Sequence, residues 1–241
     1  MPKRLTFLSA GAVLFFCFIF FSFLVHKNTF THLDFNTTVR LQDHISRRFD
    51  LPFSILSSVG QFEFMAVILG VVLLIFRQIK AGFVAFCFFV GFHLVEVFGK
   101  YFVHHPPPPQ FLVRTYNIMQ FPDYYVQNLN SYPSGHSGRT LFVAVIALTL
   151  VWQSRKIGFI AKVLITCFIL AFAITMLVSR IYLGEHWLSD VIGGSILGTS
   201  LGLFSSVLLL KTAHHNEHHT DHTEKKKGFL PKFKIEVKRV E

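Results

Sequence analysis

Two short polar segments interrupt a chain that is otherwise rich in apolar residues. The first is Pro-Ser-Gly-His at 133–136, and the second runs from Ser179 to Asp190 and contains Arg180 and His186. Arginine offers a planar pair of donors to phosphate oxygens, and histidine can act as a nucleophile or exchange a proton near neutral pH. These residue types are those needed to hold and cleave a phosphate ester.

The spacing within each segment indicates the start of a helix. Proline and serine favour the first positions of a helix, and Gly135 lets a ligand approach the free N–H groups, which attract anions. His186 and Asp190 are four residues apart, so on a helix the carboxylate can orient the imidazole or stabilise its charged form. Taken singly, the segments could be a plain helix cap and charges at an interface; together they favour a phosphate site.

A third set of ionisable residues lies within an apolar stretch. His93, Glu96 and Lys100 are spaced by three and four residues, which places them on one face of a helix. A charge facing lipid costs about 3 kcal/mol or more, so this face is expected to point into the protein or a water-filled cavity. The alternative for His93 and Glu96 is structural, with Glu96 paired to Lys100. Lys100 lies at the end nearest the two polar segments and is a candidate phosphate ligand.

The composition predicts an all-α integral membrane protein. The 241 residues are 52% hydrophobic and include 30 Phe, with a mean hydropathy of +0.50, which is too apolar for a soluble domain. A helix needs about 20 residues to cross a bilayer. Six spans are predicted, at residues 6–25, 59–76, 81–103, 137–153, 158–180 and 187–210.

The net charge of +10 does not indicate nucleic-acid binding, because the basic residues sit in clusters beside the apolar runs. Clusters at 3–4, 77–80, 155–162 and after 210 all fall on one side, which the positive-inside rule makes cytoplasmic. Both termini are then expected in the cytoplasm, and the polar segments at the external face, most simply of the plasma membrane. The basic residues of the loop at 40–48 run against this rule.

Three further features concern packing and the chain outside the spans. Residues 35–49 carry apolar side chains on one helical face, which predicts an amphipathic helix on the membrane surface, either a connector or a guide for a lipid headgroup. Gly194, Gly198 and Gly202 repeat every four residues, which favours close packing inside the bundle over a dimer interface. Residues 211–241 are rich in His and Lys and are expected to form a flexible cytoplasmic tail, with metal binding as the alternative.

The polar segments resemble those of the type 2 phosphatidic acid phosphatase superfamily, whose helical core is shared with vanadium-dependent haloperoxidases. The family pattern is a lysine followed after six residues by Arg-Pro, then Pro-Ser-Gly-His, then Ser-Arg, five residues, His, three residues and Asp. The second and third motifs match here at 133–136 and 179–190. The resemblance implies a six-span helical domain over residues 1–210.

The first motif departs from this pattern. Lys100 matches, but Pro107 stands where the arginine is expected. Arg114 or Arg139 is the expected substitute, and His104 or His105 could also donate when protonated.

The resemblance implies a metal-independent phosphatase without a cofactor. His186 would attack phosphorus, Asp190 would orient it, and His136 would protonate the leaving oxygen. The residues expected to hold phosphate oxygens are Lys100, Ser134, Gly135 and Arg180, with Arg114 or Arg139.

The expected substrates are membrane lipids such as undecaprenyl diphosphate or phosphatidic acid. A lipid phosphotransferase using the same site is an alternative. Pro107 also leaves open a non-catalytic protein that binds lipid phosphates. The sequence does not predict the oligomeric state.

Overall fold

Helices account for the regular structure in the part of the chain that the computed structural model describes, residues 2–116 and 130–210. Two short 3₁₀ helices occur at Arg47–Phe49 and Gln110–Leu112. The α-helices in these residues are α1 (Pro2–His26), α2 (Thr31–His44), α3 (Asp50–Val59), α4 (Phe62–Ile75), α5 (Ile79–Phe102), α6 (Gly135–Gln153), α7 (Phe159–Tyr182) and α8 (Leu188–Leu209). The tail predicted at 211–241 lies outside the described residues.

Five helices, α1, α5, α6, α7 and α8, are each long and apolar enough to cross a bilayer. They confirm five of the six predicted spans. The second predicted span, 59–76, is not one straight helix, because α4 reaches the required length only together with residues 47–59, at a bend of 61°. The helix is interrupted at Gly60 and Gln61, and the backbone of Gln61 is extended.

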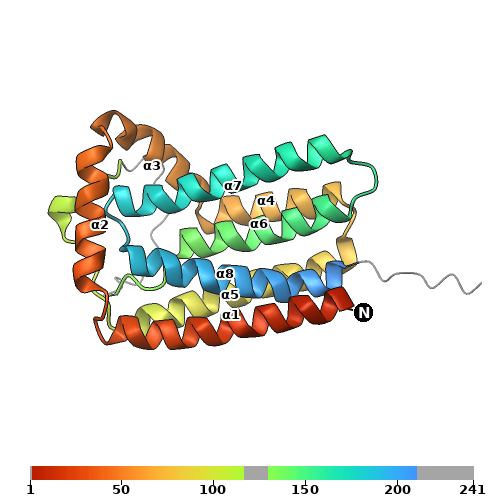
Figure 1. Cartoon of the computed structure of the whole chain (residues 1–241), viewed down its shortest axis with the longest axis horizontal. Helices are drawn as coiled ribbons and strands as arrows, with labels where there is room; N and C mark the ends of the chain where they lie inside the picture. Colours follow the sequence, from red (N-terminus) through yellow and green to blue (C-terminus); the bar gives the residue numbers. More distant parts are fainter. Residues whose placement is uncertain (1, 117–129, 211–241) are drawn as a thin grey trace, which may run out of the picture. The chain divides into compact units, whose positions relative to one another are not determined.

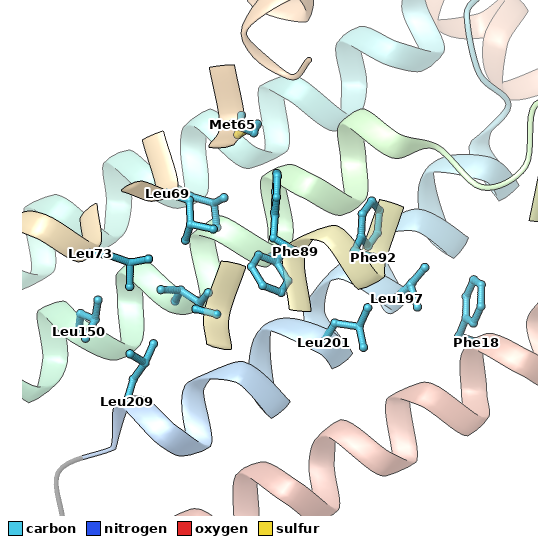
Figure 2. Close-up of a cluster of buried hydrophobic side chains, with 14 of the residues drawn as sticks. Phe18, Met65, Leu69, Leu73, Phe89, Phe92, Leu150, Leu197, Leu201 and Leu209 are labelled. Atoms are coloured by element: carbon cyan, nitrogen blue, oxygen red, sulfur yellow. The ribbon is translucent and has the colours of Figure 1, made fainter. Parts of the chain in front are cut away.

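Helices α6 and α8 pack against each other more extensively than any other pair. Helices α1 and α5 pack against α8, whereas α4 and α7 pack against α6. Figure 2 shows the buried apolar cluster that joins these helices, including Phe18 of α1, Leu69 of α4, Phe89 of α5 and Leu197 of α8. Inside a bilayer such contacts stabilise the bundle through close packing, since lipid is as apolar as the side chains.

Small residues allow α6 and α8 to approach closely. A Cβ at Gly198 would collide with the carbonyl oxygen of Gly138, and a Cβ at Gly194 would collide with that of Ser134. Gly202 faces α6 as well, with the carbonyl oxygen of Phe142 3.2 Å from its ideal Cβ position. The prediction that this glycine stripe packs within the bundle is confirmed.

The amphipathic helix predicted near residues 35–49 is present as α2, which crosses one end of the bundle (Figure 1). Its buried face is polar and consists of Asp34, Thr38 and Gln42, whereas Phe35 is exposed. Gln42 Nε2 donates to the carbonyl oxygens of Leu112 and Tyr182 at 2.7 and 2.8 Å. Hydrogen bonds therefore hold the polar face of α2 on the bundle, and Phe35 faces outward.

Candidate active site

The two polar segments meet at the end of the bundle that α2 crosses (Figure 1). The Ser134 N–H donates to the Asp190 carbonyl oxygen at 3.0 Å, which joins the start of α6 to the start of α8. Between α7 and α8 the chain turns at Gly184, whose φ of +67° suits glycine. A Cβ there would also collide with the Leu112 carbonyl oxygen. This turn brings Arg180, in the last turn of α7, close to the beginning of α8.

The predicted start of α6 is confirmed, with Ser134 at the N-cap and Gly135 as the first helical residue. Both are buried. A Cβ at Gly135 would collide with the Glu96 carboxylate, so glycine is needed for the close approach of α5 to this helix start. The free N–H groups and the positive end of the helix dipole make it a place for an anion.

The pair formed by His186 and Asp190 is buried. His186 Nδ1 lies 3.3 Å from Asp190 Oδ2, which also accepts the Trp187 N–H at 3.0 Å. Asp190 therefore fixes the imidazole through Nδ1 and leaves Nε2 for other chemistry. Burial lowers the pKa of His186 below its usual value, although the hydrogen bond to Asp190 opposes this. The imidazole is then uncharged at neutral pH, as a nucleophile must be.

His136 lies on α6 one residue inside the helix start. Arg180, Arg139, Lys100 and His186 are all near enough to act on it electrostatically. Three cations and both motif histidines thus form one cluster, which is the residue set that cleavage of a phosphate ester needs.

Two buried or partly buried carboxylates balance these cations. Glu96 Oε1 lies 3.0 Å from Lys100 Nζ, and Glu96 Oε2 lies 2.6 Å from Arg139 Nη1. The pairing of Glu96 with Lys100, which the sequence offered as the structural alternative, is present. Arg180 is paired with Glu185 and also donates to the Ser57 hydroxyl of α3.

Only one of the two candidate substitutes for the missing arginine joins this cluster. Arg139 is buried, shares Glu96 with Lys100, and donates from Nε to the Gly60 carbonyl oxygen at 3.2 Å. Arg114 instead donates to the Gln42 carbonyl oxygen and lies over the ring of Tyr182, 5.3 Å from its centroid.

The loop after α5 carries Pro107 away from these cations. Pro107 lines a separate pocket of about 770 Å³ together with Phe35 and Trp187, and Trp187 Nε1 donates to the Pro106 carbonyl oxygen at 2.8 Å. The position expected to hold the arginine therefore faces α2.

Sequence reasoning missed the contacts of two buried residues, His105 and Asp34. His105 Nδ1 lies 2.7 Å from Asp190 Oδ1, and His105 Nε2 lies 3.5 Å from Asp34 Oδ2. Burial lowers the pKa of His105, but the hydrogen bonds to Asp190 and Asp34 outweigh it and raise the pKa to about 9. The polar stripe of α2, which begins at Asp34, was a signal that the sequence contained. No pattern in the sequence indicated the pairing of His105.

Comparison with known proteins agrees with this arrangement. The model of the PAP2 superfamily matches residues 80–213, which is more than half of the chain. An undecaprenyl-diphosphatase of Sulfolobus acidocaldarius is 32% identical over 155 residues, covering 62% of this chain and 66% of the relative. The alignment thus spans just under two thirds of that relative's length.

A transmembrane PAP2 type phosphatidylglycerolphosphate phosphatase from Bacillus subtilis has a similar structure. It superimposes with a TM-score of 0.64 over 82% of this chain and 93% of that one, at 21% identity. This likeness shows a shared fold. The family match covers α6 to α8 and nearly all of α5, the helices that hold both motifs and Lys100, and the chain therefore belongs to the PAP2 superfamily.

Proposed function

We propose that this protein is a lipid phosphate phosphatase that works without a metal ion, through a phosphohistidine, at the external face of the membrane. The observation that carries the proposal is the hydrogen bond between Ser134 and Asp190. It brings His136 and His186 together beside Arg180, although the two motifs are far apart in the sequence. The name of the Sulfolobus acidocaldarius relative supports a phosphatase.

In the first step, Nε2 of His186 attacks phosphorus while Nδ1 remains on Asp190. The bond that breaks joins phosphorus to the lipid oxygen or, in a diphosphate, joins the terminal phosphorus to the oxygen that bridges the two phosphorus atoms. The leaving oxygen takes a proton from His136. In the second step, water attacks phosphorus and the P–N bond breaks. The water proton passes to His136, and inorganic phosphate leaves.

The phosphoryl oxygens are held by Lys100, Arg139 and Arg180 with the N–H of Gly135 and the Ser134 hydroxyl. Preorganised positive charge of this kind is the main contribution to phosphoryl transfer. Glu96 keeps Lys100 and Arg139 side by side. The entering phosphate competes with Glu185 for Arg180.

A membrane lipid is the substrate, with undecaprenyl diphosphate and phosphatidic acid as the leading candidates. Exposed apolar side chains on α1, α5 and α7, such as Phe20, Phe83 and Phe168, support a bundle surrounded by lipid. The other end of the bundle carries Arg77 and Lys156, and by the positive-inside rule we place it in the cytoplasm, with both termini.

The test uses the full chain purified in detergent with EDTA and offered a panel of lipid phosphates and diphosphates. We expect release of inorganic phosphate from at least one lipid, and loss of release by about 10³-fold or more in His186→Ala. His44→Gln is the control, since His44 is exposed on α2 and, within the described part of the chain, its side chain bonds to the Arg40 carbonyl oxygen of its own helix.

Three results would contradict the proposal. Activity that needs an added metal ion would exclude the metal-independent mechanism. Phosphate that moves only to an added lipid alcohol would identify a phosphotransferase. Binding of lipid phosphates without turnover of any of them would identify a binding protein.

A further inference from the structure

We propose that His105 and Asp34 are positioning residues that hold Asp190, and through it His186, in the geometry for attack. This inference rests on the proposed function. The four side chains form one buried row, Asp34, His105, Asp190 and His186, with ring nitrogens and carboxylate oxygens in alternation.

Both oxygens of Asp190 are needed in this row. Oδ2 accepts from Trp187 and faces His186, whereas Oδ1 has His105 Nδ1 as its partner at 2.7 Å. Asp190 is fully buried. Without His105, Oδ1 would lack this donor at a position with no exposed surface, and the carboxylate could rotate away from His186.

Asp34 fixes the far side of His105 and the backbone beside Asp190. It accepts the Ser189 N–H at 2.8 Å and the Ser189 hydroxyl at 2.7 Å, while Oδ2 faces His105 Nε2. One carboxylate of α2 therefore holds both His105 and the first turn of α8.

The backbone of His105 is also anchored. Its N–H donates to the Asn130 side chain at 2.9 Å, and its carbonyl oxygen accepts the Ser131 N–H at 2.9 Å. These residues lead directly into Pro133 and the start of α6. The imidazole is thus fixed from three elements: its own loop, α2 and α8.

This arrangement excludes the role in phosphate binding that the sequence left open for His105. Its two ring nitrogens face Asp190 and Asp34, so neither is available to a phosphate oxygen. The loop in which Pro107 replaces the family's arginine supports the nucleophile through the contact of His105 with Asp190, and Arg139 supplies the cation. A residue that acts through His186 should affect kcat more than KM.

The experiment compares His105→Gln, His105→Ala and Asp34→Asn with wild type and with His44→Gln. We measure kcat, KM, the melting temperature and the Kd of orthovanadate, which becomes five-coordinate when a nucleophile binds vanadium and then imitates phosphorus under attack. We expect His105→Ala to lower kcat about 100-fold and the other two variants about 10-fold, with KM within about threefold of wild type. Orthovanadate should bind correspondingly more weakly, whereas inorganic phosphate should bind as before.

Wild-type kcat in a folded His105→Gln protein would overturn the inference. A fall in kcat, in substrate affinity, in phosphate affinity and in melting temperature together would also overturn the inference, because this pattern indicates a general structural role. A wild type that binds orthovanadate without turnover leaves vanadate affinity as the deciding measurement. A wild type with neither turnover nor vanadate binding would overturn the proposed function and this inference together, whereas normal turnover in the His105 variants overturns only the inference.

Discussion

At the scale of single residues, one buried carboxylate organises two of the site's cations. Glu96 pairs with both Lys100 and Arg139. Replacing Arg139 by Gln leaves Glu96 paired with Lys100 but removes one charged hydrogen bond, so we expect a loss of about 2 kcal/mol in stability and of about 100-fold or more in kcat/KM.

The double variant Arg139→Gln/Glu96→Gln tests this pairing. It also takes the carboxylate away from Lys100, so its melting temperature should fall below that of Arg139→Gln, while phosphate release stays low. Arg114→Gln should show the smaller loss of activity, since Arg114 contacts Gln42 and Tyr182. Activity retained in Arg139→Gln and lost in Arg114→Gln would reverse the assignment of the substitute cation.

The protonation of His105 predicts how stability depends on pH. Its pKa is raised from the usual 6.5 to about 9 by Asp190 and Asp34, despite burial. The folded protein therefore binds a proton that the unfolded chain releases. The resulting stabilisation is fully present below pH 6.5, falls as pH rises through 9, and amounts to about 3 kcal/mol.

Melting temperatures measured from pH 6 to pH 10 check this prediction. Wild type should lose stability over this window more steeply than His105→Gln, which has no titrating group at this position. Parallel curves would show that His105 does not hold the extra proton.

Motif spacing identified residues whose partners are close in sequence, such as His186 and Asp190. The contacts of His105 and Asp34 were not predictable in this way. His105 is 85 residues from Asp190, and Asp34 is 155 residues from Ser189. Pairings of this kind depend on how α2 and the loop after α5 pack on the bundle, which no local pattern records.

At the scale of elements, the contact between α6 and α8 sets the positions of both motif segments. An alanine methyl at Gly198 would push against the backbone of Gly138 and separate the helices. We expect Gly198→Ala to destabilise the protein by about 2 kcal/mol and to lower activity, as measured by thermal unfolding and phosphate release.

Gly91→Ala is the matched control, because among the described residues no heavy atom beyond the local backbone of α5 lies within 4 Å of a Cβ at Gly91. This change should be neutral or stabilise the helix by up to about 1 kcal/mol. An equal effect of the two substitutions would show that helix propensity, and not the α6–α8 contact, decides the outcome at Gly198.

Hydropathy was sufficient to predict the five long helices, because each is a continuous apolar run. It could not show that two helices meet at a bend at Gly60 and Gln61, since the bend is marked by tertiary contacts and not by the apolar pattern. The Gly60 carbonyl oxygen accepts from Arg139, and Gly60 packs against His136. For residues 35–49 the periodicity predicted a helix, and α2 covers the part up to His44, but the periodicity did not show that the buried face would be the polar one.

At the scale of the whole molecule, the bundle has two different ends. One carries α2 and the starts of α6 and α8, whereas the other carries the start of α1 (Figure 1). A pocket at that second end is lined by Arg77, Arg155 and Lys156. If the latter end is cytoplasmic, Asp43→Cys on α2 should react with a membrane-impermeant maleimide in intact cells. Lys156→Cys should react only after permeabilisation.

Both variants are made in a chain whose native cysteines, Cys17, Cys87 and Cys167, are replaced by Ala. Labelling of Lys156→Cys in intact cells, with Asp43→Cys protected, would place the site on the cytoplasmic side. Retained phosphate release in each variant shows that the labelled protein is folded.

The break in the second span has a practical consequence for handling the protein. Arg139 and Arg180 hold the chain on the N-terminal side of the break, through the Gly60 carbonyl oxygen and the Ser57 hydroxyl. An oxyanion bound between these arginines would link three helices that detergent tends to separate. Phosphate at 100 times its Kd should add about 2.7 kcal/mol of stability, whereas chloride at equal ionic strength should add much less. Preparations kept in phosphate buffer should therefore stay monodisperse longer than those kept in Tris.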